Sequence, residues 1–168
     1  MTNVNKDHIQ RLFAFHHWAT DRVFDAMSAA TPEQLDRKWG GSFGSGRALL
    51  RHVVGVERLW HDRWKGQSAK SVPEFPATHG GKAFRAEWES VKKDQQRFIG
   101  ALTPGQLDGD LTYTNIKGET WTYPFADILI HCANHGTYHR GQLTHLLRDL
   151  GISAPSTDYL MFVEGRKG

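Results

Sequence analysis

The sequence predicts an all-α protein, a four-helix bundle with a short β-hairpin before the last helix. Apolar residues recur at helical spacing in four long blocks, glycine and proline separate these blocks, and one short segment alternates apolar and polar residues. Helices that each carry one apolar face can bury those faces only against one another, so a bundle is the simplest arrangement. At 168 residues, the chain is expected to form a single domain over residues 1–168.

The first helix is expected over about residues 5–29, where the apolar residues recur at helical spacing, and Thr31-Pro32 stops it. A glycine-rich loop follows, and Ser45 is expected to cap a second helix that reaches about Lys65. The apolar faces of these two helices are formed by Ile9, Leu12, Phe13, Val23, Phe24 and Met27 in the first, and by Leu49, Val53, Val56, Trp60 and Trp64 in the second.

A polar stretch that contains two prolines is long enough to connect helices that are not neighbours in the bundle. The third helix is expected over about residues 82–102. Residues 110–123 alternate apolar and polar side chains around Lys117-Gly118, which predicts a hairpin. Pro124 then opens a fourth helix that runs to about Leu150.

Composition and charge exclude several classes of protein. The net charge is only +3, from 21 Lys and Arg against 18 Asp and Glu, and the basic residues are scattered, so nucleic-acid binding is not expected. No apolar stretch approaches the roughly 20 residues of a membrane helix, and the first residues lack the apolar segment of a secretory signal, so a cytoplasmic protein without membrane attachment is expected. Cys132 is the single cysteine, which rules out a disulfide framework and a cysteine-cluster zinc site.

Histidines are the unusual feature of this chain, which has ten of them. The predicted fourth helix contains HCANHGTYHRGQ, with three histidines at intervals of four. At about 100° per residue, His139 lies about 20° from the centre of the apolar stripe, His135 about 60° and His131 about 100°. His135 and His139 therefore point inward one turn apart, the spacing at which two imidazoles can bind one divalent ion. His145 falls far outside the stripe and is expected in solvent.

A catalytic metal usually takes three protein ligands and keeps one position open, so a third ligand must come from another helix. The second helix offers His52 on the flank of its apolar face, whereas His61 lies further from that face. His16 also lies in an apolar stripe, and Gln95 lies in that of the third helix.

The alternative for any single inward histidine is a hydrogen-bonded core residue, and this alternative is favoured for His16. His131 is expected on the flank of its helix, and His17 is expected at the surface. Cys132 is expected to be a small buried hydrophobe.

Several segments resemble the DinB family, also called the DinB/YfiT-like metalloenzymes. They are FHHWATDRVF, LLRHVVGVERLW, NHGTYHRGQL and LRDLGISAP, and with the hairpin they span nearly the whole chain. The resemblance implies an up-down-down-up bundle, a homodimer and a metal triad at His52, His135 and His139. It implies that the cofactor is a divalent transition metal, for which zinc and nickel are the leading candidates and manganese and iron the next. Many relatives have asparagine near the position of His16 or His17, so the fourth coordination position is not fixed by the resemblance.

The resemblance also implies an activity, that of a metal-dependent S-transferase or isomerase whose partners are a low-molecular-weight thiol, such as mycothiol or bacillithiol, and an electrophilic substrate. An all-histidine triad leaves the charge of the ion uncompensated, which suits a thiolate or a hydroxide. One alternative is a metal-dependent hydrolase, for which Glu57 is the nearest candidate for a general base. Another is a non-catalytic metal-binding module of a stress response, in which the ion holds the bundle together.

Overall fold

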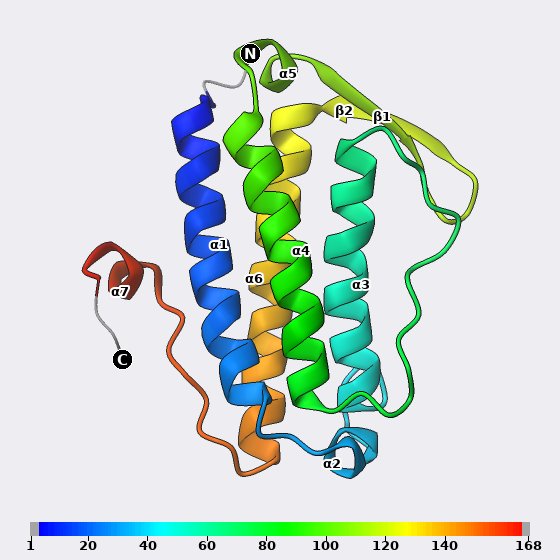
Figure 1. The fold of residues 1–168 in the computed structure, drawn as a ribbon, viewed down its shortest axis with the longest axis vertical. Helices are drawn as coiled ribbons and strands as arrows, with labels where there is room; N and C mark the ends of the chain where they lie inside the picture. Colours follow the sequence, from blue (N-terminus) through cyan, green and yellow to red (C-terminus); the bar gives the residue numbers. More distant parts are fainter. Residues whose placement is uncertain (1–3, 166–168) are drawn as a thin grey trace.

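Four long helices dominate the computed structural model, which describes residues 4–165. They are α1 (Lys6–Met27), α3 (Gly46–Trp64), α4 (Gly81–Ala101) and α6 (Phe125–Asp149). The four lie side by side, and α1 and α3 each pack against both α4 and α6 (Figure 1). In this view, α1 and α6 run downward, while α3 and α4 run upward. Across residues 4–165, no helix combines the length and the apolarity that crossing a bilayer requires.

Three short helices and one hairpin complete the fold. The short helices are α2 (Pro32–Asp36), α5 (Pro104–Leu107) and α7 (Tyr159–Val163), and the hairpin pairs β1 (Asp110–Thr114) with β2 (Thr120–Pro124) in antiparallel register. Gly118 in the turn has φ 84°, a conformation that glycine adopts without strain. The prediction of a mainly helical chain with a hairpin before the last long helix, α6, is therefore confirmed, and the short helices, among them α7 after α6, were not predicted.

The ends of the long helices follow the chemistry of their sequence. Asn5 accepts a hydrogen bond from the backbone N–H of His8 at the start of α1, and Ser45 accepts one from Ala48 at the start of α3. After α6, Gly151 takes a positive φ of 71°, which ends the helix. The segment 65–80 then links α3 to α4 along the outside of the molecule, so that the two helices run in the same direction (Figure 1).

The apolar core is divided into two clusters, one toward each end of the long helices. On α1, for example, Phe13 belongs to one cluster and Val23 to the other. Each of the four helices carries buried polar or charged side chains between its contributions to the two clusters, and the set includes His16, Glu57, Gln95 and Arg140. We call this region the polar layer. Buried polar groups require partners, so the contacts in this layer decide what the site can do.

Candidate metal centre

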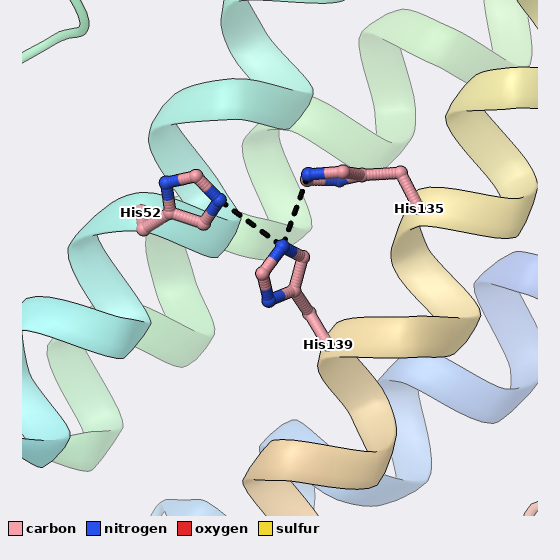
Figure 2. A group of neighbouring side chains, drawn as sticks. All are labelled: His52, His135 and His139. Carbon is pink, nitrogen blue, oxygen red and sulfur yellow. Dashed lines mark hydrogen bonds between the residues drawn. The ribbon is translucent and has the colours of Figure 1, made fainter. Parts of the chain in front are cut away.

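Three imidazoles from two helices converge on one point (Figure 2). His52 comes from α3, and His135 and His139 come from successive turns of α6. The Nε2 atom of His139 lies 3.1 Å from Nε2 of His52 and 3.0 Å from Nε2 of His135, and the three ligand atoms all lie within 4.8 Å of one another. We call these residues the histidine cluster. The structure thus brings together the three residues that the sequence singled out.

Hydrogen bonding orients the ring of His139. Its Nδ1 lies 2.7 Å from Oε1 of Gln142, one turn further along α6. Because a carbonyl oxygen can only accept, Nδ1 carries the proton and Nε2 presents a lone pair. His52 and His135 both face this one lone pair, which can accept only one hydrogen bond in the plane of the ring. Three nitrogens that cannot all bond to one another fit a shared cation, so the donor set is suitable for a divalent transition metal.

Burial keeps these imidazoles in the form that binds metals. It lowers the pKa of His52 to about 4, with a further contribution from His139. Burial and the neighbouring His139 likewise lower the pKa of His135 to about 4, and burial lowers that of His139. At neutral pH the rings are therefore uncharged and keep their lone pairs.

Aromatic rings border the histidine cluster. Phe43, in the loop before α3, lies 4.7 Å from the ring of His52 and 5.8 Å from that of His139 between centroids. Tyr138 approaches the other side of His139 at 5.1 Å. His139 is only 4% exposed, while His52 and His135 are half-buried. The cluster is therefore partly sheltered by aromatic side chains and remains open to small molecules beside His52 and His135.

A second set of polar side chains lies in the polar layer. Nε2 of His16 lies 3.3 Å from a carboxylate oxygen of Glu57, and the other oxygen of Glu57 accepts a 2.7 Å hydrogen bond from Gln95. The amide oxygen of Gln95 lies 2.9 Å from Nε2 of His17, and Arg140 donates a 3.0 Å hydrogen bond to Nδ1 of His16. We call these five residues the buried network. It joins all four long helices and pairs one carboxylate with one guanidinium through His16.

The buried network contains one negative and one positive group, Glu57 and Arg140, whose charges offset each other. Burial by itself would raise the pKa of Glu57, but His16 and Gln95 outweigh this effect and lower it to about 2. Burial lowers the pKa of His17 to about 4 and that of Arg140 to about 10. Glu57 and Arg140 are therefore both charged at neutral pH, whereas His17 is neutral. A carboxylate held in this way is a structural anion rather than an available base.

The structure corrects one expectation for α1. His17 was predicted at the surface, yet it is only 5% exposed. The buried face of α1 is wider than one apolar stripe because the helix packs against both α4 and α6. His16 lies in the core, as the stripe predicts, but its two ring nitrogens face Glu57 and Arg140. His16 is therefore held by the buried network and is not one of the three clustered histidines.

Two side chains on α6 that contact the histidine cluster or the buried network, Gln142 and Arg140, were not predicted from the sequence. Both lie in the segment NHGTYHRGQL, so the motif itself contained the signal. Gly136, in the same segment, is also required, because a Cβ added there would lie 2.3 Å from Cε1 of His16. Outside the motif, His61 is buried against Trp64 and Phe98, although it was expected further from the apolar face. His145 is exposed, as predicted, and His131, which was expected on the flank of its helix, is exposed as well.

These observations define a class of protein: a helical fold with one small sheet and a candidate metal centre of three histidines. The chain matches the model of the DinB family over residues 1–167, and it belongs to that family.

Known proteins with similar sequences or structures agree with this assignment. Protein DinB of Bacillus subtilis (strain 168) is 24% identical over 158 residues, which cover 91% of this chain and 92% of the relative. The crystal structure of a DinB-like protein from Bacillus cereus ATCC 10987 superposes with a TM-score of 0.71 at 18% identity, covering 89% of this chain and 95% of the other. The crystal structure of a DinB-like protein from Bacillus subtilis superposes with a TM-score of 0.67 at 17% identity, covering 89% of this chain and 97% of the other. At these identities the two structures show that the fold is shared.

Proposed function

We propose that this DinB-family protein binds one divalent transition metal ion through His52, His135 and His139 and is a metal-dependent S-transferase or isomerase. The proposed co-substrate is a low-molecular-weight thiol, and the second substrate is an electrophile. Zinc or nickel is the expected metal, with manganese or iron as the next candidates. We further propose the up-down-down-up order of a four-helix bundle, a homodimer and a cytoplasmic location.

The observation that carries this proposal is the all-imidazole donor set of the histidine cluster, in which three Nε2 atoms lie within 4.8 Å of one another. When bound there, the ion would supply a positive charge that lowers the pKa of a thiol and stabilises its anion. Gln142 holds the Nδ1 proton of His139, so Nε2 stays directed at the ion. Phe43 and Tyr138 flank the cluster and limit the access of water.

Glu57 argues against the hydrolase alternative. A hydrolase requires a free general base near the ion, and Glu57 was the candidate. His16 and Gln95 face its two carboxylate oxygens, and together they lower its pKa to about 2. A base so weak and so fully engaged is unsuited to accept a proton at neutral pH. The S-transferase hypothesis needs no such base, because a thiol near the ion can lose its proton to solvent.

Elemental analysis of untagged protein tests the metal. The parent should contain about one transition-metal ion per chain, and His52→Ala and His139→Ala should each lose it. His145→Ala is the matched control, since His145 is an exposed residue of the same helix outside the cluster, and its metal content should equal that of the parent. A folded parent that takes up no ion from added zinc, nickel, manganese or iron would overturn the proposal.

The transferase step is tested separately with bacillithiol, mycothiol and cysteine as thiols and 1-chloro-2,4-dinitrobenzene as the electrophile. In this reaction the sulfur forms a bond to the ring carbon, chloride leaves with the bonding pair, and the thiol proton goes to solvent. We expect turnover with at least one thiol that is lost on chelation and restored by the metal. Retained metal with no metal-dependent turnover, together with a large loss of folding stability on chelation, would favour the non-catalytic module.

A further inference from the structure

A hollow of about 300 Å³ lies next to the histidine cluster. Its walls come from α3, from both strands of the hairpin and from α6, and they are formed by Trp60, Tyr113, Tyr123, Asp127, Ile128 and His131. His131 connects the hollow to the cluster, because its ring centroid lies 6.0 Å from that of His135, one turn along α6. A molecule in this hollow would therefore lie beside the proposed metal ion without replacing any of its three ligands.

The walls of the hollow are mostly aromatic. The ring of Trp60 lies 5.2 Å from that of Tyr113 and 5.4 Å from that of His131 between centroids, with edge-to-face geometry at both contacts. Tyr123 adds a third large ring from the second strand. Flat aromatic surfaces bind planar rings well, because stacked and edge-to-face contacts add to the burial of apolar area. The volume matches the lower end of the range for small-molecule sites.

Arg63, which is not itself a lining residue, places a cation against two of these walls. The guanidinium carbon of Arg63 lies 4.5 Å from the ring centroid of Trp60 and 4.5 Å from that of Tyr113. Arg63 is only 6% exposed, and its Nε is buried without a hydrogen-bond partner. Within residues 4–165, no carboxylate forms an ion pair with it. The positive charge at this wall is therefore not neutralised by the part of the chain that the structure describes.

The sign of the ligand charge follows from the burial of the two charged residues. Asp127 also lines the hollow, but it is exposed, so water and salt screen its charge. Arg63 is buried among aromatic rings, where the local dielectric is lower and its field extends further. A cationic ligand would face the same two rings that Arg63 already occupies, and it would be repelled. An anionic group is therefore favoured on the Arg63 side of the hollow.

We infer that this hollow binds a planar aromatic carboxylate, with its ring between Trp60, Tyr113 and Tyr123 and its anionic group toward Arg63. The inference rests on the proposed function in one respect, which is that a molecule bound there would be the electrophilic substrate held beside the thiol. None of the residues that line the hollow is a proposed metal ligand, so binding to the hollow and binding of the metal can be tested separately.

Calorimetric titration with 1-naphthoate tests the inference. 1-Naphthylmethylamine and 1-naphthalenemethanol serve as cationic and neutral probes with the same ring system. Each titration is made with the protein as purified and after treatment with a chelator, so that binding of the carboxylate to a metal cannot account for the signal. We expect saturable binding of 1-naphthoate in both preparations, tighter than that of the other two probes.

Two variants and one control locate the bound probe. Arg63→Met removes the charge but keeps an unbranched side chain. It should weaken the binding of 1-naphthoate by about tenfold or more and have little effect on the binding of 1-naphthalenemethanol. Tyr123→Ala, at an exposed hairpin position that tolerates truncation, should weaken all three probes. Arg58→Met, on the same helix but at a residue that pairs with Glu87 instead of lying over Trp60 and Tyr113, should leave all affinities unchanged.

The outcomes separate the two proposals. Absence of saturable 1-naphthoate binding, equal affinity for all three probes, or tighter binding of the amine would each overturn the inference. Unchanged 1-naphthoate affinity in Arg63→Met would do the same. Metal retained by a protein that fails to bind 1-naphthoate leaves the proposed metal centre standing, whereas Arg63-dependent binding by a protein that takes up no metal supports the hollow and overturns the metal proposal.

Discussion

The histidine cluster lies on α3 and α6, whereas the buried network draws on all four long helices, and the two differ in how their polar atoms are satisfied. In the buried network, Glu57 and Arg140 supply opposite charges, and His16 lies between them. The histidine cluster contains three imidazoles and no carboxylate, and two of its rings face the single lone pair of His139. The first arrangement offsets its own charges without a ligand, whereas the second gains a full set of bonds when it shares a cation.

This difference indicates that the buried network stabilises the fold and that the histidine cluster is the region suited to binding a metal ion. A buried network whose charges offset one another holds the four helices together, and removal of its carboxylate or its guanidinium leaves an uncompensated charge. A group of imidazoles without a counter-charge, two of them half-buried, contributes little to folding until an ion is bound. We therefore expect substitutions in the buried network to change stability, and substitutions in the histidine cluster to change metal binding.

The largest expected effect is that of Glu57→Ala. It leaves Arg140 buried without a carboxylate and removes the partner of Gln95, so the free energy of unfolding should fall by about 3–5 kcal/mol. Urea denaturation of the chelator-treated protein measures this loss. His135→Ala is the comparison under the same conditions, and it should cost less than about 1 kcal/mol. A cost for His135→Ala equal to that for Glu57→Ala would break the distinction between the two regions.

A second prediction concerns pH and His17. Burial lowers the pKa of His17 in the folded protein to about 4, against 6.5 in the unfolded chain, so the unfolded state binds more protons between these values. The contribution to stability is complete above pH 6.5, declines as the pH falls, and is lost below the folded pKa. A shift of this size corresponds to about 3 kcal/mol.

Urea denaturation at several pH values between 4 and 7.5 measures this dependence. The groups that act on His17 are Gln95, His16, Glu57 and Lys92, and none of them is removed by His17→Asn. The stability of this variant should decline less steeply with falling pH than that of the parent. Identical slopes in the two proteins would show that His17 is not the titrating group.

Two glycines of α6 give the third prediction. Gly136→Ala would place a Cβ 2.3 Å from Cε1 of His16, so His16 must move away from Arg140, and we expect a loss of about 2 kcal/mol. Gly141→Ala is the matched control, because no atom lies within 4 Å of the added Cβ. Its higher helix propensity should stabilise the protein by up to about 1 kcal/mol. Thermal unfolding of both variants checks these opposite signs.

The smallest effect is expected for Gln142→Leu. The variant loses the acceptor that holds the Nδ1 proton of His139, and the affinity for metal should fall by about tenfold. Competition with a chromophoric chelator measures the affinity. Tyr138→Phe is the control, since it removes a hydroxyl that accepts a 3.4 Å hydrogen bond from the amide nitrogen of Gln142 and leaves the acceptor for His139 in place, so its affinity for metal should match that of the parent. An unchanged affinity in Gln142→Leu would remove Gln142 from the centre.

The three short helices show one limit of sequence interpretation. Helices of four or five residues are too short for apolar periodicity to appear. Two of them nevertheless begin with the same pattern of threonine, proline, any residue and glutamine, at Thr31 and Thr103, and both form capping boxes. The pattern at Thr31-Pro32 was interpreted as the end of the first helix, although it also begins the next one. Cap chemistry could therefore have identified α2 and α5, while α7 has only a simpler cap, in which Asp158 accepts a hydrogen bond from the backbone N–H of Leu160.

The sequence by itself determined the features that depend on local periodicity. The apolar stripes fixed the four long helices, and the interval of four residues placed His135 and His139 on one face, because a helix repeats every 3.6 residues. The glycine turn of the hairpin and the caps at Asn5 and Ser45 are likewise local. Such features follow from a few neighbouring residues and need no knowledge of the rest of the chain.

Only the tertiary structure decided which side chains meet across helices. Periodicity placed His52 on the flank of its own helix, but the packing of α3 against α6 brought its Nε2 within 3.1 Å of His139. The burial of His17 and the pairing of Glu57 with His16 also depend on how α1, α3 and α4 pack. Distances between helices depend on how many side chains from several helices pack together, and the apolar periodicity of a single helix does not predict them.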